Sequence, residues 1–190
     1  MLILFNNETQ KGIGKMKKNI KGKLKKIKLL ILDVDGVMTD GRIIMDSEGH
    51  EIKNFDVRDG HGIKLLQRYG IKVAILTGRQ SKVVEYRAKD LDIKDVYQKV
   101  FNKKEVFEKI LRKHKLSANE VAYMGDDIVD IPVLKRVGFS AAVADAVDVV
   151  KKSVDYITKN TGGHGAVREL CEMILQAKGE WKEIAAKYEF

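Results

Sequence analysis

The 190-residue sequence contains one cysteine, one proline and no long apolar run, and each shortage excludes a class of protein. The single cysteine, Cys171, rules out an internal disulfide framework and a zinc site built from cysteines. No apolar run approaches the roughly 20 residues that cross a bilayer, and the opening MLILF is too short for a signal-peptide core. With 44% hydrophobic and 33% charged residues, the chain is predicted to be a globular, cytoplasmic protein.

The formal charge of +9 is concentrated in one segment. Residues 1–28 carry nine lysines against a single acid, Glu8, whereas the rest of the chain is nearly neutral. Glycines, Gly22 among them, interrupt any helix in this segment, and aromatic residues are scarce, which argues against a membrane anchor and against nucleic-acid binding. We therefore expect residues 1–26 to form a basic, flexible arm, with Met16 as an alternative natural start.

The remaining chain alternates apolar strands with amphipathic helices, which is typical of a doubly wound α/β fold with a mainly parallel, Rossmann-like sheet. Strands are predicted at 29–32, 73–76, 95–97, 121–124, 139–142 and 156–157, and helices at 61–69, 81–91, 104–114, 131–136 and 166–178. Residues 42–55 break the alternation with two short strands around a turn, and this hairpin is expected to stand as a flap over the carboxyl edge of the sheet. We expect one domain over 27–178 and a C-terminal tail over 179–190.

Polar residues follow three of the predicted strands, at the edge where parallel sheets bind ligands. These residues are Asp33 and Asp35, then Thr77, Gly78 and Arg79, and finally Asp126, Asp127 and Asp130. Converging carboxylates need a counter-charge, and Mg²⁺ supplies it with oxygen ligands. Lys103 precedes a predicted helix and offers an ammonium group to a phosphate at the same edge. Because the first strand breaks at Gly36, one carboxylate is free to attack phosphorus while the other gives and removes a proton.

The order of these motifs resembles the haloacid dehalogenase superfamily of aspartyl phosphatases. The segments that carry the resemblance are Asp33-Val34-Asp35-Gly36-Val37, Leu76-Thr77-Gly78-Arg79, Lys103 and Gly125-Asp126-Asp127-Ile128-Val129-Asp130. The resemblance implies that Asp33 is the nucleophile and that Asp35 is the general acid and base. It also implies that Thr77 and Lys103 bind the transferring phosphoryl group.

The same resemblance implies where the Mg²⁺ ion is held. Its ligands would be the side chains of Asp33 and Asp126 and the backbone carbonyl of Asp35. Asp127 and Asp130 would orient the metal-bound waters and the phosphate-binding lysine.

The spacing between the motifs leaves no room for the cap domain that many superfamily members use to enclose their substrate. Three further segments, 57–63, 143–146 and 162–169, are similar to a capless branch that acts on phosphorylated sugar acids. The strongest similarity is to phosphatases of 3-deoxy-D-manno-octulosonate 8-phosphate in lipopolysaccharide biosynthesis, and nine-carbon 2-keto-3-deoxy or sialic acid 9-phosphates remain an alternative. The branch implies a homotetramer in which hairpin and tail elements of neighbouring subunits help to close the site.

A sugar acid phosphate carries two anionic groups, and each needs a cationic partner. Candidates are Arg79, Arg58 and Arg168, since a guanidinium group binds a carboxylate bidentately. Gly78, Asp59 and His61 are placed with them in the substrate site. The glycine-rich loop 162–165 is a candidate for anion binding at the start of the last helix or for a hinge.

Two other classes of protein fit parts of this pattern. A phosphoacceptor receiver domain also places Asp, Thr and Lys at strand ends, but it needs a long-lived phosphoaspartate, which Asp35 would help to hydrolyse. A catalytically silent scaffold is the third interpretation, and the complete set of motifs argues against it. The sequence therefore favours Mg²⁺-dependent hydrolysis of a small phosphate ester.

Overall fold

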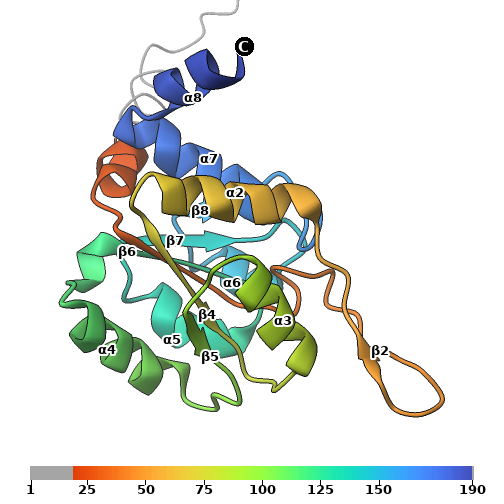
Figure 1. Cartoon of the computed structure of the whole chain (residues 1–190). Helices are drawn as coiled ribbons and strands as arrows, with labels where there is room; N and C mark the ends of the chain where they lie inside the picture. Colours follow the sequence, from red (N-terminus) through yellow and green to blue (C-terminus); the bar gives the residue numbers. More distant parts are fainter. Residues whose placement is uncertain (1–18, 190) are drawn as a thin grey trace, which may run out of the picture.

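The computed structural model describes residues 19–189 and builds them around one six-stranded sheet with helices on both faces (Figure 1). The strands of this sheet are β1 Leu29–Leu32, β4 Lys72–Leu76, β5 Asp95–Tyr97, β6 Val121–Gly125, β7 Phe139–Ala142 and β8 Tyr156–Ile157. They lie in the order β5-β4-β1-β6-β7-β8, and every pairing is parallel. The predicted doubly wound α/β class is therefore confirmed. β1, whose four residues are fully buried, lies between β4 and β6 at the centre of the sheet.

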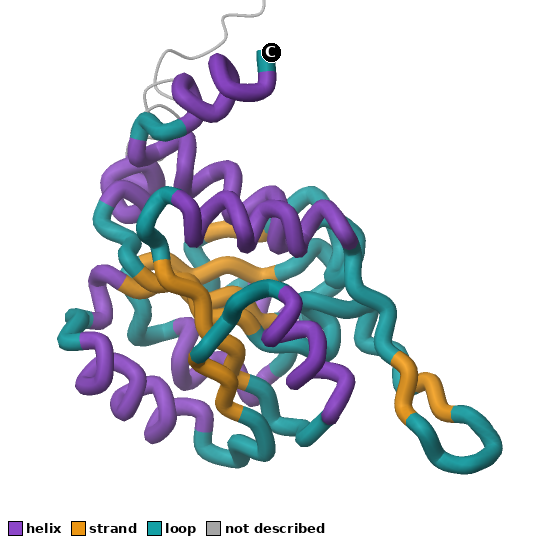
Figure 2. The backbone as a smooth tube through the Cα atoms, in the orientation of Figure 1, coloured by secondary structure: helices purple, strands orange, loops and turns teal. Residues whose placement is uncertain are grey.

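Helices cover both faces of this sheet (Figures 1 and 2). They are α2 Val57–Arg68, α3 Lys82–Asp90, α4 Lys103–His114, α5 Ile131–Leu134, α6 Asp148–Lys151, α7 Ala166–Lys178 and α8 Trp181–Tyr188, with 3-10 turns at Ala118–Glu120 and Ile128–Asp130. α2 and α7 pack against each other on one face, and α4 and α5 pack together on the other. Cys171 is fully buried on α7, as expected for a core residue. Within residues 19–189, no helix has the length and apolarity needed to cross a membrane.

Helix α2 begins four residues before the expected start at His61. The Asp56 side chain caps it by accepting a hydrogen bond from the N–H of Arg58 (2.6 Å). Gly60 and Gly62 lie inside this helix, although glycine is a poor helix former. A side chain at Gly62, however, would come within 3.1 Å of the Cα atom of Arg168 on α7. The glycine therefore allows the two helices to pack closely.

Both ends of the domain are more ordered than expected. Residues 19–25, which were assigned to the flexible arm, form a helix that includes Gly22, and Leu24 is buried against the core. The rest of the expected arm, residues 1–18, lies outside the described residues. The expected C-terminal tail contains α8, whose Ile184 is also buried. These apolar contacts extend the packed domain beyond the boundaries that the sequence indicated.

The hairpin is present as β2 Ile44–Met45 paired antiparallel with β3 Glu51–Ile52. Its tip projects away from the domain and does not lie over the sheet as a flap would (Figures 1 and 2). Its stem returns to the carboxyl edge, where Lys53 forms an ion pair with Asp35. The projecting part exposes about half of each of three apolar side chains, Ile43, Met45 and Ile52.

Candidate active site

Asp33 lies immediately after β1, at the centre of the carboxyl edge. Its backbone N–H donates to the carbonyl of Met124 on β6 (3.1 Å), and its Oδ1 accepts from the N–H of Val34 (2.7 Å). Its Oδ2 lies 2.7 Å from Nζ of Lys103, the first residue of α4. Only 6% of Asp33 is exposed, and this burial, partly offset by the Lys103 ammonium, raises its pKa to about 6.

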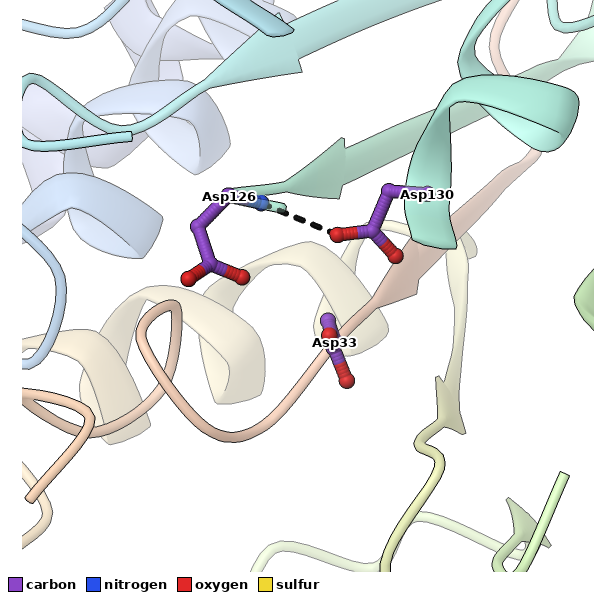
Figure 3. A group of neighbouring side chains, drawn as sticks. All are labelled: Asp33, Asp126 and Asp130. Carbon is purple, nitrogen blue, oxygen red and sulfur yellow. Dashed lines mark hydrogen bonds between the residues drawn. The ribbon is translucent and has the colours of Figure 1, made fainter. Parts of the chain in front are cut away.

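Asp130 fixes both the lysine and the loop after β6. Its Oδ1 accepts hydrogen bonds from Nζ of Lys103 (2.7 Å) and from the hydroxyl of Tyr123 (2.5 Å). Its Oδ2 accepts from the backbone N–H groups of Asp126 (3.0 Å, Figure 3) and Asp127 (3.2 Å). Each oxygen of this fully buried carboxylate thus has two donors. Asp130 therefore fixes the position of Lys103 and of the loop after β6, and it has little capacity left to bind a metal.

Asp126 reaches the site from the end of β6, beside the turn after β1. A Cβ atom at Gly36 would lie only 2.1 Å from Oδ2 of Asp126, so glycine is required there for the carboxylate to fit. The backbone of Gly36, with φ of +81°, is also one that glycine adopts readily. Burial, reinforced by the nearby carboxylates of Asp33 and Asp130, raises the pKa of Asp126 to about 7.

The carboxylates of Asp33 and Asp126, with Asp130 beside them, fit a hard divalent cation. One oxygen each from Asp33, Asp126 and Asp130 lies within 4.8 Å of the others (Figure 3). Lys103 alone cannot neutralise the three carboxylates. The raised pKa values of Asp33 and Asp126 come first from burial and then from repulsion by the neighbouring carboxylates. Mg²⁺ prefers such oxygen ligands and keeps several of its own waters.

Asp35 turns its side chain toward the hairpin stem. Its Oδ1 forms an ion pair with Nζ of Lys53, and its Oδ2 lies 3.7 Å from Nε of Arg79. Oε1 of Glu51 contacts both of these cations, at 3.2 Å from Lys53 and 3.0 Å from Arg79. Sequence reasoning missed Glu51 and Lys53. Their spacing of two residues on an extended strand, which places both side chains on one face, was the available signal.

A cavity of about 290 Å³ opens onto these groups. It is lined by Asp33, Asp35, Gly36, Gly41, Thr77, Gly78, Arg79, Lys103, Asp126, Asp127 and Val129. A larger cavity of about 780 Å³ lies at the amino ends of β4 and β5 and includes none of these residues. The structure thus brings the four predicted catalytic residues together with the acidic residues that follow β6.

Comparisons with known proteins agree with this geometry. Residues 92–170 match the family described as haloacid dehalogenase-like hydrolase. A 3-deoxy-D-manno-octulosonate 8-phosphate phosphatase from Escherichia coli is 46% identical over 170 residues, which is 90% of each chain. The chain belongs to the haloacid dehalogenase superfamily.

Solved structures of superfamily members share the fold. A 3-deoxy-D-manno-octulosonate 8-phosphate phosphatase from Moraxella catarrhalis, solved with magnesium ion, phosphate ion and a KDO molecule, has a TM-score of 0.88 and 40% identity, covering 90% of this chain and 98% of that one. The cobalt-bound phosphatase from Haemophilus influenzae has a TM-score of 0.80 and 45% identity, covering 83% and 92%. The predicted superfamily and the predicted Mg²⁺ cofactor are thereby confirmed.

Four residues that the sequence placed in the substrate site lie elsewhere in this superfamily fold. Asp59 is buried, and it accepts hydrogen bonds from the backbone N–H groups of Gly165 (3.3 Å) and Arg168 (2.7 Å). It therefore caps the start of α7, where the N-cap residue is a glycine without a side chain. Burial is the main reason that its pKa is raised to about 6.

The other three residues also stand apart from the nucleophile. Arg58 and Arg168 line a second cavity of about 390 Å³, together with His164. Within the chain, Arg58 pairs with Asp56 (2.8 Å) and Arg168 pairs with Glu172 (2.5 Å). His61 packs edge-on against the ring of Tyr188 on α8. Of the three predicted arginines, Arg79 is thus the one that lines the cavity of Asp33.

The glycine-rich loop before α7 packs against the turn that follows the nucleophile. A Cβ atom at Gly162 would lie 1.8 Å from the carbonyl oxygen of Gly36. The N–H of Gly163, whose φ is +66°, donates to the carbonyl of Val37 (3.0 Å). The loop therefore supports the active-site turn through close backbone contact, a role distinct from the anion site or hinge that the sequence suggested.

Proposed function

We propose that this chain is a Mg²⁺-dependent phosphatase that converts 3-deoxy-D-manno-octulosonate 8-phosphate to the free sugar acid and phosphate. The observation that carries the proposal is the contact of buried Asp33 with Lys103 beside Asp126, which joins a nucleophile, a phosphate-binding cation and a metal ligand in one cavity. The 46% identity to the Escherichia coli phosphatase supports this substrate and a place in lipopolysaccharide biosynthesis.

In the first step, a carboxylate oxygen of Asp33 attacks phosphorus and the ester P–O bond breaks, which leaves an aspartyl phosphate. Asp35, which enters this step carrying the proton it gained from water in the previous turnover, gives that proton to the departing sugar oxygen, on the side of the site that faces the hairpin. Lys103 and Thr77 bind the non-bridging phosphoryl oxygens. Bound Mg²⁺ would be held by Asp33, Asp126 and the carbonyl of Asp35, and would offset the negative charge of the phosphoryl group.

In the second step, water attacks the phosphorus of the aspartyl phosphate. Asp35, now ionised, accepts a proton from this water, and the P–O bond to Asp33 breaks to release phosphate. Asp130 holds Lys103 in place throughout, through its 2.7 Å hydrogen bond. Asp127, at the edge of the same cavity, is placed to orient water bound to the metal.

The substrate carboxylate needs a cation that the cavity itself provides. Arg79 is our first assignment, because it lines the cavity with Gly78 and its side chain is 41% exposed. Arg58 and Arg168 face a separate cavity, so they would contact substrate only across a subunit boundary.

A homotetramer in the cytoplasm is the assembly that we propose for this site. The exposed apolar side chains of the hairpin support it, and so do Ile128 and Val129 beside the cavity, which are 58% and 54% exposed. Neighbouring subunits could cover these side chains and shield an open, capless site from water. Light scattering on the purified chain should give about four times the 21.5 kDa subunit mass. A monomer at working concentration would contradict the shared closure.

The proposed function is tested by measuring phosphate release from eight-carbon and nine-carbon 2-keto-3-deoxy sugar acid phosphates with and without Mg²⁺. We expect the eight-carbon substrate to give the higher kcat/KM, chelation to stop turnover, and Asp33→Asn to abolish it in a folded protein. A preference for the nine-carbon substrate would move the chain to the alternative substrate class. A stable phosphoprotein with no turnover would instead indicate a receiver-like domain.

A further inference from the structure

The hairpin stem places a second buried lysine in the active site. The side chain of Lys53 is only 1% exposed, comparable to the 2% of Lys103. Each of these ammonium groups pairs with one of the two aspartates after β1: Lys103 with Asp33, and Lys53 with Asp35. A buried ammonium group without a partner would be strongly destabilising, and each of these lysines has a second carboxylate partner as well, Asp130 for Lys103 and Glu51 for Lys53.

The partners of Lys53 leave it little freedom to bind substrate. Its Nζ contacts Asp35 and also Oε1 of Glu51, which in turn lies 3.0 Å from Nη2 of Arg79. In this group each of the two cations, Lys53 and Arg79, contacts both of the two anions, Asp35 and Glu51, so the charges balance. Among the described residues, Lys53 is not one of those that line the 290 Å³ cavity, whereas Asp35 and Arg79 are. The lysine therefore supports Asp35 from behind.

We propose that Lys53 is a positioning residue that holds the Asp35 carboxylate on the leaving-group side of the site. This inference rests on the proposed function, in which Asp35 transfers the proton. Without the lysine, the Asp35 carboxylate keeps only its 3.7 Å approach to Arg79, and it is free to rotate away from the departing oxygen. Proton transfer depends on hydrogen-bond reach, so this loss of orientation slows the chemical step more than substrate binding.

The test compares Lys53→Met with the wild-type enzyme in single-turnover measurements of the phosphoryl-transfer step. A sugar phosphate has a poor leaving group that needs a proton, whereas p-nitrophenyl phosphate releases a stable anion that needs none. We expect transfer from the sugar phosphate to fall about 100-fold, the typical contribution of a general acid, and transfer from p-nitrophenyl phosphate to fall less than about tenfold. KM for the sugar phosphate should change by less than about threefold.

Two further variants separate positioning from a structural role. Lys64→Met removes a lysine–aspartate pair on the surface, that of Lys64 on α2 with Asp92 after α3, and it should leave both transfer rates unchanged. Lys53→Arg keeps the positive charge and should recover most of the lost rate with the sugar phosphate.

Three outcomes would overturn the inference. The first is a rate of phosphoryl transfer that does not change in Lys53→Met. The second is an equal loss of rate with the sugar phosphate and with p-nitrophenyl phosphate that Lys53→Arg does not recover. The third is a rise in KM of Lys53→Met at constant kcat. In each of these cases the wild-type enzyme still turns over, so the proposed function stands. A wild-type chain without phosphatase activity on either ester would refute the proposed function itself and the inference with it.

Discussion

Replacing Gly36 with alanine should disable the metal site without unfolding the protein. The added Cβ atom would lie 2.1 Å from Oδ2 of Asp126 and 2.6 Å from its Cγ, whereas real Cβ contacts stay beyond about 3.0 Å. The turn itself cannot retreat easily, because Gly162 packs on the Gly36 carbonyl and Gly163 donates to Val37. The carboxylate of Asp126 must therefore move by about 1 Å.

A displacement of this size is large on the scale of metal coordination. Mg²⁺ requires near-octahedral geometry with oxygens at about 2.0–2.1 Å, so a ligand shifted by about 1 Å is lost. A comparable misplacement of a catalytic group can reduce a rate by about 100-fold. We therefore expect the apparent Mg²⁺ affinity and kcat/KM of Gly36→Ala each to fall by about 100-fold, or about 2.7 kcal/mol.

The backbone offers a matched control for this substitution. Gly49, in the hairpin turn, has the same φ of +81°, but nothing lies within 4 Å of the position of its Cβ atom. Gly49→Ala should therefore show only the backbone strain of about 1–2 kcal/mol that both variants share. Mg²⁺ titration calorimetry and urea denaturation of both variants separate the two effects. If folded Gly36→Ala binds Mg²⁺ like Gly49→Ala, the reasoning about Asp126 is wrong.

Four further predictions concern the carboxylates of Asp33, Asp126, Asp130 and Asp59. Because the pKa values of Asp33 and Asp126 are raised to about 6 and about 7, Mg²⁺ must displace protons from these carboxylates below neutral pH. The Mg²⁺ affinity measured by calorimetry should therefore fall by up to about tenfold for each pH unit below pH 7. An affinity that stays constant between pH 8 and pH 6 would contradict this. The same raised values mean that the metal-free fold loses stability as pH rises from about 4 to about 7, which melting temperatures without Mg²⁺ can check. Asp130→Asn removes the buried negative charge beside Lys103 and leaves two of the four donors without an acceptor. It should lower the free energy of unfolding by about 3–5 kcal/mol in urea, and a loss below about 1 kcal/mol would be inconsistent. Asp59→Ala should lower the free energy of unfolding by about 1–3 kcal/mol and leave KM unchanged, because Asp59 caps α7. A raised KM would indicate that Asp59 contacts the substrate.

The catalytic core could be predicted because its residues follow strands whose order is fixed by the sheet. A continuous apolar run such as 29–32 marks a buried strand, and parallel strands deliver their next residues to one edge. Asp33, Thr77 and Asp126 therefore met as expected. Lys103 was identifiable as the residue just before a predicted helix, and in the structure it is the first residue of α4.

The substrate-site residues could not be predicted in the same way. Asp59 follows the hairpin closely in sequence, but α2 begins early and turns it into the core, where it caps α7. Conversely, Glu51 and Lys53 look like surface charges of a short hairpin. Lys53 reaches Asp35 only because the chain after the hairpin runs back to the carboxyl edge of the sheet, and the spacing of residues along the strand does not reveal this course of the chain. The helix over 19–25 and α8 were missed for a similar reason: each is packed onto the domain by the burial of one apolar residue, Leu24 and Ile184 respectively.

The charges of the site divide into two halves, and the division explains where a cation is needed. Around Lys103, the three carboxylates of Asp33, Asp126 and Asp130 exceed the available positive charge, and two of them have raised pKa values. On the hairpin side, the carboxylates of Asp35 and Glu51 are balanced by Lys53 and Arg79. The additional positive charge of a metal ion is therefore needed around the nucleophile Asp33 and not around Asp35. The acid–base half is held by protein charges alone, so the hairpin stem can keep Asp35 oriented whether or not the metal is bound.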